Sequence, residues 1–339
     1  MADGADGPKV LVAGASGFAG ALAARLIDRH PRFRLGAVTS RSDAGARLDD
    51  LYPHHRVDAV LEELDLDRHG PAHDAAIVGY PHAASAPVVA ELRRHGVRVV
   101  DLSADFRLDD IDVYQDYYEV AHPHPELLEH AVYGLPELYR EQLRHTSLVA
   151  GPGCYPTAAI LTLAPLARAG LIADVVIDAK SGVSGAGRGA TQATHFVSVA
   201  ENVKPYKVGM HRHAPEIDQE LRALGADVTV TFTPHLLPLD EGELVSCYVT
   251  TPDGVEAGDV AALYAEAYRD EPFVEVVDRP PGVRDVRETN VCRIHVQVDR
   301  RTGKVLAFGA IDNLWKGTSS QAVQSLNLMF GFDEGEGLL

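Results

Sequence analysis

Hydrophobic runs alternate with helical patterns along the first half of the chain. The segment KVLVAGASGFAGALAARLIDRHP begins with an uninterrupted apolar run, which is typical of a strand buried on both faces of a parallel sheet. After its glycine turn, Leu22, Leu26 and Ile27 lie close to helical spacing. RLGAVTS, HDAAIVGYP and RVVDLSADF predict further strands, and SAPVVAELRRHG predicts a helix. This alternation indicates an α/β fold with a doubly wound parallel sheet.

Longer strands with polar alternation follow in the second half. VVIDAKSGVSG, DVTVTFTPHLLP, ELVSCYVTT, NVCRIHVQVDR and KVLAFGAIDN predict an antiparallel or mixed sheet with one solvated face. GDVAALYAEAYRDEP predicts a helix between two of these strands. A last helix is predicted from about Thr318, packed back on the first domain, and the tail DEGEGLL is expected to fray.

Length and charge narrow the class of protein. At 339 residues the chain exceeds what one hydrophobic core usually supports, so we expect two domains. The net charge of −18 argues against a nucleic-acid binder, which needs a basic face. No stretch approaches the roughly 20 apolar residues of a membrane span, and MADGADGPK is unlike a signal peptide.

The cysteines point to a reducing compartment. Cys154, Cys247 and Cys292 lie far apart and form no CxxC pair, so neither a disulfide framework nor a zinc site is supported. We therefore expect no metal and a cytoplasmic location, where a reactive thiol stays available.

A glycine-rich turn after the first strand predicts a dinucleotide site. The turn GASGFAG matches G-x-x-G-x-x-G and lies between a strand and a helix. Glycines let a pyrophosphate approach the backbone, and the helix N-terminus stabilises its charge. An ordinary glycine turn is the alternative. The residues predicted to bind the cofactor here are Gly14, Ser16, Gly17, Phe18, Ala19 and Gly20.

The end of the second strand indicates which dinucleotide binds. It carries Thr39, Ser40 and Arg41, where a site for NAD would usually carry Asp or Glu for the ribose 2′-hydroxyl. Hydroxyl groups and a guanidinium suit a 2′-phosphate, so we predict NADP bound by Ser40 and Arg41. Arg41 as a solvated surface residue is the alternative.

GPGCYPTAA places Cys154 at or just before a helix. Gly151 and Gly153 leave the backbone bare ahead of the thiol, and Pro156 fits the first helical turn. A helix N-terminus favours an anion and lowers a thiol's pKa, which predicts a nucleophile. A small buried hydrophobic residue is the alternative.

HRHAPEI gathers two histidines, an arginine and a glutamate. A histidine can titrate near neutrality, as acid–base catalysis needs, and the pattern does not say which of His211 and His213 carries the proton. Metal binding by this pair is an alternative, but its spacing suits a strand rather than the helical i, i+4 pair, and no third ligand is evident.

A second glycine-rich loop, KSGVSGAGRGATQ, follows a strand. It lacks the Gly-Lys-Thr of a nucleotide P-loop. Ser181, Ser184 and Arg188 could instead hold a carboxylate or phosphate, with a flexible linker as the alternative. A dinucleotide, an activated thiol, a histidine and an anion loop together suit hydride transfer to a thioester, which an acyl phosphate would form on the thiolate.

The chain also resembles the N-acetyl-gamma-glutamyl-phosphate reductases, the arginine-pathway family of the semialdehyde dehydrogenase group. GASGFAG, DLSADFR, GPGCYPT, KSGVSGAGR, HRHAPEI and DNLWKG carry the resemblance in order over nearly the whole chain. It implies a Rossmann NADP-binding domain (1–153 and 313–339) and an inserted α+β catalytic and dimerisation domain (154–312). It also implies an oligomer, a homodimer or homotetramer, and a small acyl phosphate as substrate.

The resemblance assigns roles to individual residues. It implies Cys154 as the nucleophile and His211 as the acid–base residue. It adds Ser184, Gly185 and Asn313 to the cofactor site. The residues implied for the substrate are Ser103, Arg107, Ser181, Arg188, Tyr206, His213 and Lys316.

Three alternative functions share parts of this pattern. A lysine-pathway reductase acts on aminoadipyl phosphate carried by an acidic carrier protein, which a basic rim would admit better than this acidic chain. Aspartate-semialdehyde dehydrogenases match HRHAPEI and GPGCYPT less well. A non-catalytic NADP-binding sensor would need neither Cys154 nor His211.

Overall fold

The computed structural model describes residues 7–253 and 259–339. The first six residues of MADGADGPK and the first residue of GDVAALYAEAYRDEP therefore lie outside the described residues. The chain divides into two compact units, residues 1–152 with 318–339 and residues 153–317. Within the described part of the chain, no helix is long and apolar enough to cross a membrane.

Six parallel strands form the sheet of the first unit. They are β1 (Lys9–Ala13), β2 (Arg34–Thr39), β3 (Ala75–Val78), β4 (Arg98–Asp101), β5 (Val132–Tyr133) and β6 (Leu148–Ala150). Their order is β2-β1-β3-β4-β6-β5, which confirms the predicted doubly wound sheet. The chain reverses its direction along the sheet between β1 and β3. Ligands of open parallel sheets bind outside the carboxyl ends of the strands at such a point.

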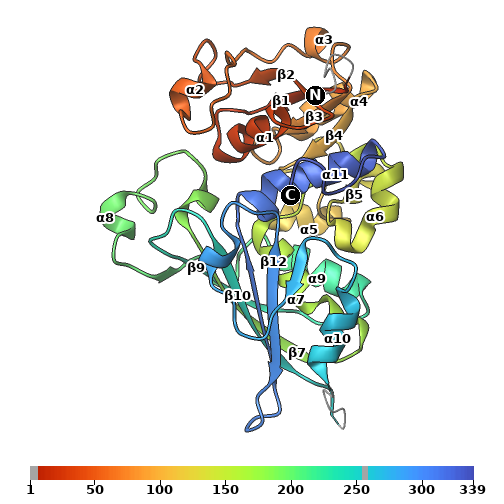
Figure 1. The fold of residues 1–339 in the computed structure, drawn as a ribbon, viewed down its shortest axis with the longest axis vertical. Helices are drawn as coiled ribbons and strands as arrows, with labels where there is room; N and C mark the ends of the chain where they lie inside the picture. The colour runs from red at the N-terminus through yellow and green to blue at the C-terminus, as the bar shows by residue number, and fades with distance from the viewer. Residues whose placement is uncertain (1–6, 254–258) are drawn as a thin grey trace. The chain divides into compact units, whose positions relative to one another are not determined.

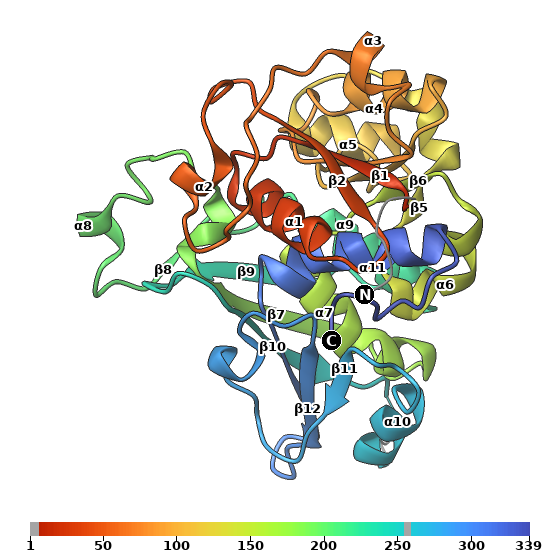
Figure 2. The same cartoon turned by 45° about the horizontal axis from the view of Figure 1, so that its top comes forward.

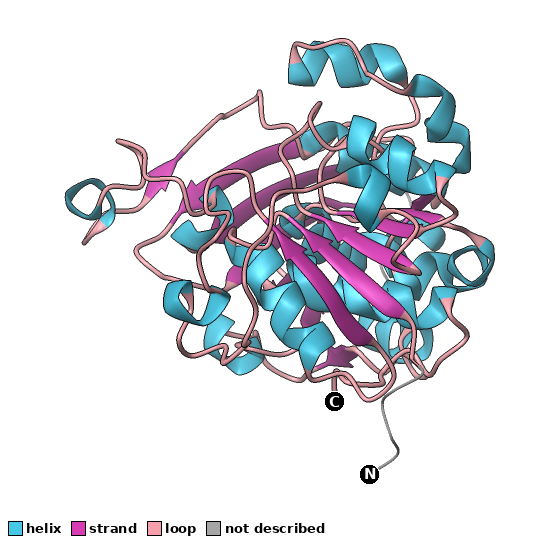
Figure 3. Ribbon diagram, turned by 90° about the horizontal axis from the view of Figure 1, so that it is seen from above, coloured by secondary structure: helices cyan, strands magenta, loops and turns pink. Residues whose placement is uncertain are grey.

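Helices flank this sheet (Figure 3). They are α1 (Phe18–Asp28), α2 (Leu48–Leu51), α3 (Leu66–His69), α4 (Ala86–Arg94), α5 (Ile111–Tyr118), α6 (Pro136–His145) and α11 (Ser320–Met329). Right-handed crossovers that run in opposite directions place α1 and α4 on opposite faces. Val10–Ala13 and all of β3 are consequently fully buried, which explains the uninterrupted apolar run.

The chain's C-terminal end packs on the first unit. Helix α11 lies against α1 and α6, and the Ser319 hydroxyl donates to the Ala19 carbonyl at 2.8 Å. Glu334 accepts from Arg140 at 3.0 Å, and His30 Nε2 lies 2.8 Å from the Glu336 carbonyl. The expectation that DEGEGLL frays is wrong, because long-range contacts that the local composition does not reveal hold it.

A mixed seven-stranded sheet forms the second unit (Figure 1). Its strands are β7 (Asp174–Ser181), β8 (Lys204–Pro205), β9 (Thr231–Leu236), β10 (Glu243–Thr250), β11 (Val274–Val276), β12 (Cys292–Val298) and β13 (Val305–Ile311). Their order is β11-β12-β13-β10-β7-β9-β8. Burial alternates along β7, whose Val175, Ile177 and Ala179 are fully buried while Val176 is half-exposed. The predicted single solvated face is confirmed.

Helix α7 (Cys154–Arg168) covers the buried face of the sheet. It contacts β10, β12 and β13, and nearly every one of its residues after Cys154 is buried. The other helices of this unit are α8 (Phe196–Val199), α9 (Ala214–Ala223) and α10 (Val260–Ala267). A π-helical turn, Trp315–Ser319, leads into α11. Helix α8 stands out on a long loop between β7 and β8 (Figures 1 and 2).

Candidate active site

The glycine turn of the first unit lies at the point where the sheet reverses. Gly14 has φ +90°, and a Cβ on it would lie 2.6 Å from the Gly79 carbonyl oxygen at the end of β3. A Cβ on Gly20 would lie 2.3 Å from the Gly14 oxygen, so only glycine lets α1 start this close to β1. Gly17 precedes α1 as its N-cap. The predicted cofactor residues 14–20 therefore form one bare turn and helix start.

Two hydroxyls connect this turn to the end of β2. Ser16 Oγ and Ser40 Oγ lie 2.8 Å apart, and both residues are buried. The Tyr52 hydroxyl donates to the Ser16 carbonyl at 2.8 Å. Arg41 is exposed, and its guanidinium carbon lies 4.7 Å from the centre of the Tyr80 ring. Ser16, Ser40 and Arg41 thus gather hydroxyl groups and a cation beside the glycine turn.

DLSADFR forms a buried polar network in the first unit. The Ser103 hydroxyl donates to Asp101 at 2.5 Å and accepts from the Asp105 N–H at 3.1 Å. Burial raises the pKa of Asp101 to about 6. Arg107 donates to the carbonyls of Gly151 at 2.7 Å and Leu102 at 2.9 Å. The Arg107 contacts hold the backbone at the start of GPGC, and contact of Ser103 or Arg107 with a substrate stays a prediction.

Cys154 is the first residue of α7, as predicted, and follows the N-cap Gly153. The Gly153 N–H donates to the Glu216 carboxylate at 2.9 Å, and a Cβ on Gly153 would lie 2.6 Å from His213 Nε2. A Cβ on Gly317 would lie 2.8 Å from the Cys154 Cβ. Cys154 is partly exposed, whereas a residue buried for packing alone would not be. The helix N-terminus would favour its thiolate.

His211 is buried among aromatic rings. It lies 5.4 Å from Tyr206 and 5.7 Å from Tyr155, measured between ring centres. Its Nδ1 accepts the N–H of His213 at 3.2 Å, so a neutral ring carries its proton on Nε2. Burial, with smaller effects from the charges of Lys207 and Arg212, lowers its pKa to about 4. The expectation of titration near neutrality is therefore wrong, because the sequence does not show how deeply the ring is buried.

Two tyrosines stand beside Cys154 and His211. The Tyr206 hydroxyl donates to the Tyr155 hydroxyl at 3.4 Å, and the latter donates to the His235 carbonyl at 3.3 Å. Burial raises the pKa of Tyr206, and a negative charge on Cys154 raises it further. Both phenols therefore stay neutral, and Tyr206 lies close to both predicted catalytic groups.

The loop KSGVSGAGR brings part of the predicted anion site together. The Asn313 amide nitrogen donates to Ser184 Oγ at 3.0 Å, and its oxygen accepts the Gly242 N–H at 2.8 Å. A Cβ on Gly185 would lie 3.4 Å from Ser181 Oγ. Arg188 is exposed farther along this loop.

Lys316 belongs to the π-helical turn just before Gly317. Its side chain is fully buried, with Nζ 5.6 Å from the centre of the Phe273 ring. A role for Lys316 in substrate binding stays a prediction.

Sequence reasoning missed Glu243. This residue begins β10 and is fully buried, and its carboxyl group faces Cys154 and Ser181. The stretch ELVSCYVTT contained a signal for it. Side chains alternate between the two faces of a strand, so Glu243 lies on the same face as the apolar Val245, Cys247 and Val249. This alternation places a charged residue on the buried face of the strand.

Comparison with known proteins identifies the family. The semialdehyde dehydrogenase NAD binding domain matches residues 9–146, and the dimerisation domain of the same group matches residues 154–313. The N-acetyl-gamma-glutamyl-phosphate reductase of Desulforudis audaxviator is 49% identical over 98% of each chain. The reductase of the same name from Pelotomaculum thermopropionicum is 47% identical over 97% of each chain.

The chain belongs to the N-acetyl-gamma-glutamyl-phosphate reductase family.

Solved structures share the fold of this reductase family member. Aspartate semialdehyde dehydrogenase II from Vibrio cholerae, complexed with ASA, matches with a TM-score of 0.74 at 18% identity, over 96% of this chain and 99% of that one. The Candida albicans aspartate semialdehyde dehydrogenase with NADP gives a TM-score of 0.71 at 14% identity, with the same coverage. At these identities the likeness shows the fold alone.

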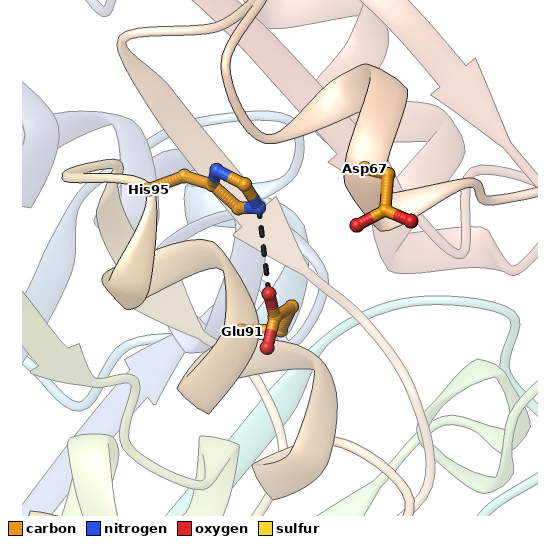
Figure 4. Close-up of side chains that lie close together, drawn as sticks. All are labelled: Asp67, Glu91 and His95. Atoms are coloured by element: carbon orange, nitrogen blue, oxygen red, sulfur yellow. Dashed lines mark ion pairs between the residues drawn. The ribbon is translucent and has the colours of Figure 1, made fainter.

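A group of possible metal ligands lies elsewhere in the first unit. Asp67, Glu91 and His95 each offer a ligand atom within 4.8 Å of the others (Figure 4). Glu91 already pairs with Arg94 at 2.7 Å and with His95 at 3.4 Å. Exposed acidic groups often lie this close without a metal ion, so we assign no metal to this group.

Replacing His211 with asparagine should reduce the loss of unfolding free energy that the protein shows when the pH falls from 7 to 5. Burial holds the folded pKa of His211 at about 4, below an unfolded value of about 6.5. Between these values the unfolded chain binds the extra proton, so stability is lost as pH falls from 6.5 towards 4. Urea unfolding at pH 7 and pH 5 should show about 2 kcal/mol less acid loss in the variant.

A matched control is available for this comparison. The exposed His54→Asn variant should lose stability with acid as the wild type does. An equal acid loss in His211→Asn and wild type would contradict the burial of a neutral ring.

Proposed function

We propose that this chain catalyses the NADPH-dependent reduction of N-acetyl-gamma-glutamyl phosphate to N-acetylglutamate 5-semialdehyde and phosphate, a step of arginine biosynthesis. The observation that carries the proposal is the position of Cys154 at the N-terminus of α7. The residue before it, Gly153, leaves no room for a side chain, because a Cβ there would meet the His213 ring. The curated relatives described above carry this activity in their names over almost their whole length.

The first unit has the features that an NADP site needs. Gly14 and Gly20 leave a cradle that a Cβ would fill, and the N-terminus of α1 favours a pyrophosphate. Ser40 and Arg41 would hold the 2′-phosphate, with Ser16, Gly17, Phe18 and Ala19 along the turn. From the second unit we assign Ser184, Gly185 and Asn313 to the cofactor. NADPH, when bound, supplies the hydride.

Cys154 would form the covalent bond to the substrate. Its thiolate attacks the acyl carbon, the carbon–oxygen bond to phosphate breaks, and phosphate leaves with that electron pair. Neutral His211, with its proton on Nε2, donates a hydrogen bond to an oxygen that gains charge. After reduction the sulfur–carbon bond breaks and the semialdehyde is released. We assign Ser103, Arg107, Ser181, Arg188, Tyr206, His213 and Lys316 to the substrate.

The domains would divide this work. Residues 1–153 with 313–339 would bind NADP, and residues 154–312 would carry the catalytic and dimerisation functions. A cytoplasmic location fits the same proposal, because the reaction needs a free thiol.

The Cys154→Ser variant should keep NADPH binding and lose turnover by more than about 10³-fold, as other enzymes do without their nucleophile. Iodoacetamide at pH 7 should modify Cys154 first in the wild type, with activity falling in step. Cys247 and Cys292 are fully buried, and burial raises the pKa of Cys247. Turnover and peptide mass mapping measure both effects, with Cys292→Ala as the active control. A Cys154→Ser enzyme of near-normal rate would disprove the nucleophile.

NADPH should be strongly preferred over NADH. Losing the Arg41 contact with the 2′-phosphate should cost about 1.5–3 kcal/mol, a typical value for a charged hydrogen bond. The kcat/KM ratio of the two cofactors should therefore fall by about 10–150-fold in Arg41→Ala. Arg34→Ala, at the opposite end of β2, is the control and should keep the ratio. Equal use of both cofactors by the wild type would refute the assignment.

The solvated sheet face of the second unit supports self-association. Val176, Tyr248 and Leu306 lie directly opposite one another across β7, β10 and β13, on the face that α7 does not cover. Val176 and Tyr248 are each 37% exposed. Such an apolar row is suited to pairing with its own copy, and residues 154–313 match a dimerisation domain. We therefore propose a homodimer through this face, or a homotetramer built from it.

Light scattering should report at least twice the 36.5 kDa of one chain. Tyr248→Glu should shift the protein towards the monomer, because it places a charge in the middle of the apolar row. Val60→Glu, at an exposed apolar residue of the first unit, is the control and should stay oligomeric. A monomeric wild type at micromolar concentration would contradict the proposal.

A further inference from the structure

Asp43 brings a carboxyl group to the part of the first unit where Ser40 and Arg41 would hold the 2′-phosphate of NADP. It follows these two residues in the loop after β2 and is partly buried. The Ser40 N–H donates to the Glu62 carbonyl at 2.9 Å, which holds the start of the loop. The Ala46 N–H donates to the Asp43 carbonyl at 3.0 Å. The carboxyl group therefore has a defined place beside the cofactor site.

Both serines that flank Arg41 direct their hydroxyl groups to Asp43. The Ser42 hydroxyl donates to Asp43 Oδ2 at 2.5 Å, and the Ser40 hydroxyl lies 3.4 Å from the same oxygen as a donor. The Asp43 N–H in turn donates to Ser40 Oγ at 3.1 Å. A hydroxyl group has one proton to donate, so a proton that points to Asp43 is withheld from a phosphate oxygen. Asp43 thus competes with a phosphate for the donors beside Arg41.

The charge of Asp43 opposes a phosphate as well. A phosphate oxygen that accepts from Ser40 Oγ would lie about 2.8 Å from it, and therefore at most about 6 Å from Asp43 Oδ2. Like charges at this separation repel, and a phosphate monoester carries a charge of about −1.5 to −2. The hydroxyl donors stabilise the carboxylate but leave its charge in place.

We propose that Asp43 is a specificity-determining residue, which limits the affinity of this site for the 2′-phosphate and so limits the preference for NADPH over NADH. Arg41 attracts the phosphate, whereas Asp43 repels it and competes for the hydroxyl group of Ser40. The two side chains therefore act on the same group in opposite directions. This inference rests on the proposed function, whose cofactor would bind here.

The test measures binding of two nucleotides without substrate. Adenosine 2′,5′-bisphosphate carries the 2′-phosphate, and adenosine 5′-monophosphate carries a 2′-hydroxyl instead. Calorimetry gives the Kd of each for the wild type and for Asp43→Asn, in which the amide oxygen still accepts from Ser42 but the charge is gone. The affinity for the bisphosphate should rise by about 5–50-fold at low salt. The affinity for the monophosphate should stay nearly the same.

A charge control and a salt control accompany this comparison. Asp28→Asn removes an exposed charge at the far end of α1 and should leave both affinities unchanged. The gain in Asp43→Asn should shrink at about 0.5 M salt, because dissolved ions screen the repulsion. A variant damaged in folding would bind both nucleotides less tightly, so damage does not produce a selective gain.

Activity gives a second readout. The ratio of kcat/KM for NADPH to that for NADH should rise in Asp43→Asn by a similar factor, opposite to the fall expected for Arg41→Ala. The change should come mainly from the KM for NADPH, because Asp43 acts on binding.

The outcomes separate the two proposals. An affinity for the bisphosphate that is unchanged or lower in Asp43→Asn overturns the role of Asp43, whatever the activity of the wild type. A wild type that reduces no acyl phosphate, while Asp43→Asn shows the selective gain, overturns the proposed function and leaves the role of Asp43 standing.

Discussion

The active site depends on the absence of a side chain at Gly153. The His213 ring fills the space that a Cβ would need, and Glu216 accepts the Gly153 N–H. These two contacts join the start of α7 to the start of α9. One junction therefore positions Cys154 on the first helix and the histidine pair just before the second. A residue larger than glycine there would push the His213 ring away from the start of α7.

Burial gives the two titratable groups of the site opposite properties. It raises the pKa of Glu243 to about 8 and lowers that of His211 to about 4. Desolvation disfavours the charged form of each, so both are neutral in the free protein near neutral pH. In this neutral form a carboxyl group and an imidazole can each donate a hydrogen bond, as the proposed reaction would require of groups near a developing negative charge.

Local sequence patterns predict the turns, the helix starts and the sheet faces of this protein. Contacts between residues distant in the sequence determine the features that the patterns do not predict. GASGFAG and GPGCYPT showed their turns and helix starts because glycine and proline constrain the backbone locally. The alternation in VVIDAKS and ELVSCYV predicted the single solvated face. The burial of His211, the surroundings of Glu243 and the anchoring of Glu334 depend on residues distant in the sequence. A single sequence does not show such contacts.

The most direct measurement is the mass of the protein after mixing with N-acetyl-gamma-glutamyl phosphate in the absence of NADPH. We expect release of one phosphate per chain and an acyl group on the peptide that contains Cys154, which NADPH then removes as semialdehyde. No acyl group, or one on Cys247 or Cys292, would contradict it.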